Sequence, residues 1–170
     1  EGNARSNAGE VWIFALDALA GVVDLRTGTS HPNFRARIIG PAVDANIRAL
    51  GVTRQGHIVI GSPGTNHLFL VRGIGGAGLF GTIDHASPTG VEVDEFFGTS
   101  AGAFGSNGAV AELSGDDQDD IVATAASFDR PGSDGAPSTV DTGRAVVVFG
   151  PFNGTRVVNL ALNAGVATGP

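Results

Sequence analysis

Oxygen-bearing residues recur at every second position of one short acidic segment, from Glu112 to Asp120. They are Glu112, Ser114, Asp116, Gln118 and Asp120. A loop that curls around a hard cation needs this spacing, because alternate residues point inward. Ca²⁺ takes about six to eight oxygen ligands from carboxylates, carbonyls and water. The segment therefore predicts a calcium site built from three carboxylates, the Ser114 hydroxyl and the backbone carbonyl of Gln118.

The crowding of this segment favours a bound cation, although a simpler interpretation also fits. Four aspartates between positions 116 and 120 repel one another unless a counter-ion is present. The segment is similar to an EF-hand only at its start, because the twelfth position from Glu112 is Ala123, within an apolar run that predicts a buried strand. The alternative is a solvated acidic turn between two strands, since Asp, Ser and Gly are common in turns.

The composition predicts an all-β protein of about one domain. Among 170 residues there are 27 Gly and 8 Pro, and only 16% are charged. Short runs of Val, Ile, Phe and Thr alternate with turn-forming residues, which is typical of many short strands. The net charge of −7 argues against a nucleic-acid partner. No apolar run reaches the roughly 18 residues of a membrane span.

Cysteine is absent, so disulfides and thiolate metal sites are excluded. An acidic chain without cysteine fits a secreted, periplasmic or cytosolic protein. The chain begins at Glu1 rather than at Met, which is expected of a trimmed or processed polypeptide.

Internal repetition gives the clearest indication of the architecture. The segment Val22–Leu25 returns as Val157–Leu160, and the apolar run at Ile58 returns at Ile121. A repeat that holds four short strands is typical of a β-propeller blade. The expected inner strands are 47–52 and 109–113, and the expected second strands are 57–61 and 120–125. The expected third strands are 10–16, 68–72 and 144–149. The expected outer strands are 22–26, 79–83 and 156–162.

Several motifs resemble the FG-GAP repeat family, which forms the propeller of integrin α-subunits and of many bacterial extracellular proteins. Phe97-Gly98 resembles the opening pair of a blade, and residues 112–120 resemble the calcium loop. Gly61-Ser62-Pro63-Gly64 stands where the family has Gly-Ala-Pro, and Gly9–Phe14 matches its third strand. The resemblance implies FG-GAP blades, bound Ca²⁺, and an extracellular or periplasmic location.

The calcium loop departs from the family pattern at three positions. Glu112 replaces the first Asp, Ser114 replaces an Asp or Asn, and Asp117 replaces a Gly. Asp tolerates the left-handed backbone that Gly favours. We therefore expect a weaker calcium site rather than none. The corresponding turn of the preceding blade, 51–57, carries Arg54 in place of carboxylates and is expected to hold no metal.

The strand count predicts an incomplete propeller of about two and a half four-stranded blades. Residues 1–30 would form the third and fourth strands of one blade, 31–92 a degenerate blade, and 93–170 the blade with the calcium loop. Closed propellers have about four to eight blades. An open arc exposes apolar faces and unpaired edges, so we expect other chains or further copies to complete it.

No catalytic motif emerges from the sequence. The four histidines lack metal-ligand spacing, and the glycine-rich segment 73–78 is interpreted as a flexible turn, because no helix pattern follows it. The favoured function is a non-catalytic, calcium-stabilised scaffold, adhesion or assembly module. The alternatives are a non-catalytic subunit of a multi-chain enzyme and a carbohydrate-binding module. A glycan site is expected near the polar segment 128–142, where only Phe128 is aromatic.

Overall fold

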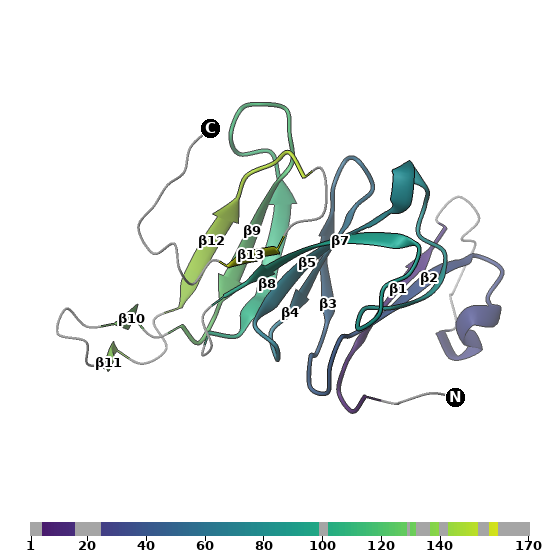
Figure 1. The fold of residues 1–170 in the computed structure, drawn as a ribbon, viewed down its shortest axis with the longest axis horizontal. Helices are drawn as coiled ribbons and strands as arrows, with labels where there is room; N and C mark the ends of the chain where they lie inside the picture. The colour runs from purple at the N-terminus through teal and green to yellow at the C-terminus, as the bar shows by residue number, and fades with distance from the viewer. Residues whose placement is uncertain are drawn as a thin grey trace.

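Short strands joined by tight turns make up the chain in the computed structural model (Figure 1). The structure describes residues 5–15, 25–98, 102–128, 130–131, 137–139, 143–152 and 157–159. The strands are β1 (Glu10–Phe14), β2 (Phe34–Ile39), β3 (Arg48–Val52), β4 (Ile58–Ser62), β5 (His67–Gly73), β6 (Gly81–Asp84), β7 (Val91–Phe97), β8 (Phe104–Ala111), β9 (Asp120–Ala125), β10 (Arg130–Pro131), β11 (Pro137–Thr139), β12 (Arg144–Val148) and β13 (Val157–Asn159). Two 3-10 helices are η1 (Leu25–Ser30) and η2 (Ile74–Gly76). Because the described residues contain strands and no α-helix, the all-β prediction is confirmed.

Three main sheets lie side by side along the molecule (Figure 1). The first has the order β1-β2-β6, the middle one β13-β7-β5-β4-β3, and the third β12-β9-β8. In the middle sheet, β3, β4, β5 and β7 form an antiparallel meander in chain order. In the third sheet, β8, β9 and β12 correspond to β3, β4 and β5 of this meander. In the first sheet, the antiparallel pair β1 and β2 corresponds to β5 and β7.

Two short strands run parallel to the outer strand of a neighbouring sheet. β6 lies in the link between β5 and β7, yet it pairs with β2 of the first sheet. β13 follows β12 and pairs with β7 of the middle sheet. Each link therefore reaches back to the preceding sheet. The repeated segment at Val157 forms one of these strands, whereas its copy at Val22 begins outside the described residues.

The middle sheet is buried on both faces, which explains the continuous apolar runs of β4 and β5. Ile58 and Ile60 of β4 pack toward the first sheet, whereas Val59 packs toward the third. In β5, Phe69 faces the first sheet and Leu68 the third. Both faces of β4 and β5 are thus covered by neighbouring sheets of the same chain.

One backbone contact fixes how closely the middle and third sheets approach each other. A Cβ added to Gly61 of β4 would lie 2.0 Å from the carbonyl oxygen of Gly105 in β8. No side chain fits into such a gap, because the atoms on both sides belong to the backbone. The Gly-Ser-Pro-Gly motif thus marks a contact between two sheets.

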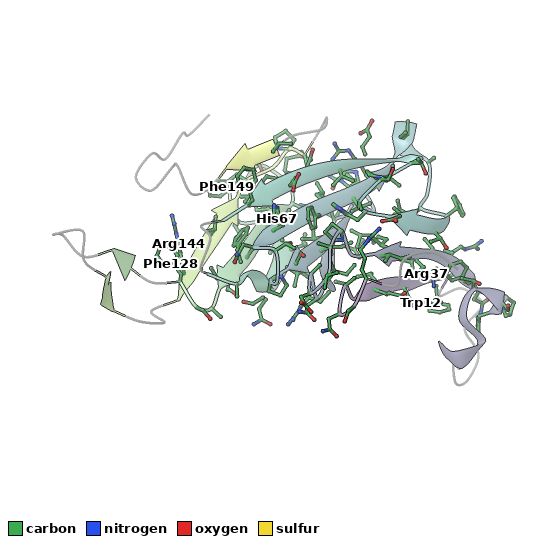
Figure 2. The ribbon with its side chains drawn as sticks, turned by 60° about the horizontal axis from the view of Figure 1, so that its bottom comes forward. Trp12, Arg37, His67, Phe128, Arg144 and Phe149 are labelled. Carbon is green, nitrogen blue, oxygen red and sulfur yellow. The ribbon has the colours of Figure 1, made fainter. Side chains whose placement is uncertain are left out.

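The outer faces of the two end sheets differ in character. On the first sheet, Trp12 meets Phe34 with ring centroids 5.7 Å apart, and the guanidinium carbon of Arg37 lies 5.7 Å from the Trp12 ring (Figure 2). His31, just after η1, borders this cluster against Phe14. On the third sheet, Val147 of β12 points outward and is 41% exposed. Among the described strands, none covers either face.

The predicted outer strands are wrong in pairing or position. β2 pairs with β1, whereas Leu25–Ser30, where the predicted strand 22–26 ends, forms η1. β7, rather than 79–83, pairs with β5. Within 156–162 the described strand is β13, and it pairs with β7 instead of β12. The inner strand predicted at 109–113 begins earlier, at Phe104, and ends at Ala111.

Among the described residues, no helix has both the length and the apolar character needed to cross a bilayer.

A half-buried histidine predicts how stability depends on pH. His85 packs on the Phe69 ring at a centroid distance of 3.9 Å, and its Nε2 has no hydrogen-bond partner within the described residues. Burial lowers the pKa of His85 to about 4. The folded-state pKa lies below the unfolded value of about 6.5, so its contribution is complete above pH 6.5 and is lost as the pH falls toward 4.

We expect the free energy of unfolding to fall by about 2 kcal/mol between pH 7 and pH 5. Urea unfolding at both pH values measures the change. In His85→Phe the decrease should be clearly smaller, because the substituted ring does not bind a proton. An equal decrease in wild type and variant would contradict this assignment.

Candidate metal site at the acidic loop

The acidic loop connects β8 to β9, so two strands of the third sheet hold its ends. The side chains of Glu112, Ser114 and Asp116 are exposed, and Gln118 is half-buried. Asp120, the first residue of β9, is fully buried with 0% exposure. The five predicted ligands therefore range from the loop surface to the interior of the sheet.

Asp120 organises the loop through backbone hydrogen bonds. Its Oδ2 accepts from the backbone N–H groups of Leu113 and Ser114 at 2.8 and 3.0 Å. Its Oδ1 accepts from the N–H of Gly150 at 3.0 Å. One buried carboxylate thus joins both ends of the loop to the chain that follows β12.

The exposed carboxylates also turn toward the loop's own backbone. A Glu112 oxygen accepts from the N–H of Gly115. Asp116 Oδ1 accepts from the Ser114 hydroxyl at 2.7 Å and from the N–H of Gln118 at 2.9 Å. These two bonds, the Ser114 bond first, lower the pKa of Asp116. Asp116 is therefore an anion at neutral pH.

Backbone conformation agrees with the expectation for Asp117, which has φ of 62°. This left-handed conformation is the one that the Gly of the family pattern provides, and Asp adopts it more readily than most residues. The substitution of Gly by Asp is compatible with the loop's turn.

Asp119 has a partner that sequence analysis missed. Its Oδ1 lies 2.9 Å from Nε of Arg54, and its Oδ2 accepts from the Arg54 backbone N–H at 2.5 Å. The Arg54 backbone donor and then its side chain lower the pKa of Asp119, and the same side-chain bond raises that of Arg54. Sequence analysis expected a bound cation to relieve the repulsion among the aspartates of the loop. Arg54, from the β3–β4 turn, relieves part of this repulsion.

The donor chemistry of the loop fits a hard cation. Carboxylates, a hydroxyl and a carbonyl are the oxygen ligands that Ca²⁺ takes. In the hydrogen bonds above, Glu112 and Asp116 each use one carboxylate oxygen, which leaves a second oxygen on each. Over the described part of the chain, no three His, Cys, Asp or Glu side chains form a preassembled metal group.

No family model, curated protein or solved structure matches the chain. The resemblance to FG-GAP repeats therefore depends on the motifs themselves and remains a prediction.

Proposed function

We propose that this chain is a non-catalytic, calcium-stabilised segment of an FG-GAP-type β-propeller that acts as an extracellular scaffold or assembly module. The observation that carries the proposal is the succession of three sheets. The middle sheet has a four-stranded antiparallel meander and is covered on both faces, whereas the described residues of each end sheet form only part of that meander. Blades of a propeller are stacked in this way.

The described end sheets show where further strands would continue the two end blades. The third sheet ends at β12, where the middle sheet continues from β5 to β7. The first sheet ends at β1, where the middle sheet continues to β4 and β3. Open edges and apolar faces favour association, so other chains or copies of this one complete the ring.

The assembly is tested by measuring the mass of the purified chain in solution. A closed ring of about four to eight blades needs about two or three copies, or additional chains that purify with this one. Light scattering after size exclusion, at several protein concentrations, distinguishes these states. A folded, cooperative monomer at every concentration would contradict the assembly proposal.

Calcium binding is tested by thermal unfolding in excess EDTA and in 10 mM CaCl₂. With a dissociation constant of about 10⁻⁴ to 10⁻³ M, as in extracellular calcium modules, mass action should raise Tm by roughly 3 to 10 °C. Asp116→Asn should abolish most of the increase, because it removes a ligand charge. Asp117→Asn is the matched control, since Asp117 is exposed and stands between ligand positions. No calcium-dependent increase in the wild type would end the metal proposal and leave the acidic-turn alternative.

A further inference from the structure

A cavity with mixed polar and apolar lining lies beside the β3–β4 turn, the turn whose Arg54 contacts the acidic loop. Its volume is about 510 Å³. Gln55 and His57 from the β3–β4 turn line one side, and Arg72 and Glu92 from β5 and β7 line another. The glycine-rich link after β5 and Phe152 complete the wall. Small-molecule sites occupy about 300 to 1,000 Å³, so the cavity has an appropriate size.

The arginine of this cavity is held in a fixed orientation. Arg72 is 6% exposed, and its Nη1 and Nη2 lie 2.8 and 3.2 Å from the carboxylate oxygens of the fully buried Asp94. Its Nε donates to Glu92 Oε2 at 2.8 Å. Salt-bridged groups on paired strands form a rigid wall, which is the kind of support that a binding site needs.

The ring of His57 lines the same cavity. Its Nδ1 is buried and has no hydrogen-bond partner within the described residues. Burial, and then the positive charge of Arg72, lower the pKa of His57, so its ring is neutral at pH 7. The His57 ring therefore adds an uncharged aromatic surface to the cavity wall.

The charge balance of the cavity selects among classes of ligand. One guanidinium faces two carboxylates, those of Asp94 and Glu92, and the neighbouring imidazole is neutral. The lining carries one charge of each sign, on Arg72 and Glu92, and Arg72 is already paired with Glu92 and with the buried Asp94 outside the lining, so phosphate and other anions gain little there. Gln55 offers donors and acceptors, while Leu79 and Phe152 add apolar surface. A neutral molecule with hydroxyl groups and apolar C–H surface matches this combination.

We propose that this cavity binds a neutral polyhydroxylated small molecule of the monosaccharide class. The carbohydrate alternative expected such a site near 128–142, and the cavity lies elsewhere, between the β3–β4 turn and the link after β5. The proposal depends neither on bound calcium nor on the number of copies in the assembly.

Saturation-transfer NMR on the full chain, in whatever assembly it forms, tests the proposal with D-glucose, D-galactose, D-mannose and L-fucose. We expect at least one of them to bind with a dissociation constant on the order of 1 mM, as a ligand of about a dozen heavy atoms allows. No signal from any of the four would overturn the proposal. Displacement of the bound sugar by equimolar inorganic phosphate would overturn the assignment of a neutral ligand.

Two variants locate the binding in the cavity. Ala77 is exposed, lines the cavity and has an ordinary φ of −63°, so Ala77→Trp fills the space without backbone strain. It should weaken binding at least tenfold, whereas Ala86→Trp, at an exposed alanine in another loop, should leave it within twofold. Gln55→Ala should weaken binding about threefold, which provides an independent test if Ala77→Trp fails to fold. Wild-type affinity in folded Ala77→Trp or in Gln55→Ala would overturn the proposal.

Discussion

Replacing Gly61 by alanine is expected to lower the free energy of unfolding by about 3 kcal/mol or more. The new Cβ would lie 2.0 Å from the Gly105 carbonyl oxygen and 2.8 Å from its carbon. Neither neighbour is the flexible end of a side chain, so relief requires β4 and β8 to move apart. Such a movement would loosen the apolar core between the middle and third sheets. Urea unfolding followed by circular dichroism measures the loss.

Gly56→Ala is the control for this experiment. Gly56 has φ of 81°, and a Cβ there would meet nothing within 4 Å. The control therefore reports only the left-handed backbone penalty, which is about 1 to 2 kcal/mol. If Gly61→Ala costs no more than Gly56→Ala, the contact between β4 and β8 can widen easily, and the inferred rigid spacing is wrong.

Asp120→Ala is expected to destabilise the chain by about 3 kcal/mol or more, even in EDTA. The substitution removes the acceptor for three backbone N–H groups, those of Leu113, Ser114 and Gly150. Hydrogen bonds to charged groups contribute about 1.5 to 3 kcal/mol each, and a buried donor left without a partner is costly. Unfolding in urea with excess EDTA separates this loss from any effect of calcium.

Two further variants separate geometry from charge. Asp120→Asn keeps one oxygen acceptor but places an amide N–H₂ where the second oxygen accepts, so we expect about half the loss. Asp117→Ala changes a nearby exposed aspartate and should have a smaller effect. If Asp120→Ala were destabilised only when calcium is present, the role of Asp120 would be that of a metal ligand rather than an organiser of the loop.

Most of the strands that sequence analysis placed correctly have continuous apolar character, although the partly exposed β3 was also placed within one residue at each end. Asp120–Ala125 was placed at its observed bounds, and β4, β5 and β12 were placed within one residue at each end. In β4 and β5, burial on both faces explains the apolar run, because every position is apolar regardless of its direction. β12 is also continuously apolar after Arg144, although Val147 is exposed.

Outer strands were missed because their polar residues are typical of loops. β7 contains Glu92, Asp94 and Glu95, yet Asp94 is fully buried because Arg72 of the adjacent strand neutralises it. A cross-strand ion pair of this kind cannot be identified before the pairing is known. The partners of β6 and β13 were equally hidden, since parallel pairing with a preceding sheet depends on tertiary contacts.

At the acidic loop, the residue types indicated the chemistry of the site, but the directions of the side chains could not be predicted. Alternation suggested that the even-numbered side chains from Glu112 to Asp120 converge, and it gave Asp119 no role. The structure turns Asp119 to Arg54, a residue far away in the sequence, and fills both oxygens of Asp120 with backbone donors. The cavity could not be predicted either, because its walls extend from Gln55 to Phe152.

Because β6 pairs with β2 of the preceding sheet, the order of synthesis determines when the first sheet can be completed as the chain leaves the ribosome. Until Gly81–Asp84 has emerged, β1 and β2 form only a two-stranded ribbon, and such ribbons are marginally stable in water. The middle meander already has four strands without β13. The first sheet therefore gains its third strand only after β4 and β5 of the next sheet have been synthesised, and shortly before β7 completes the middle meander.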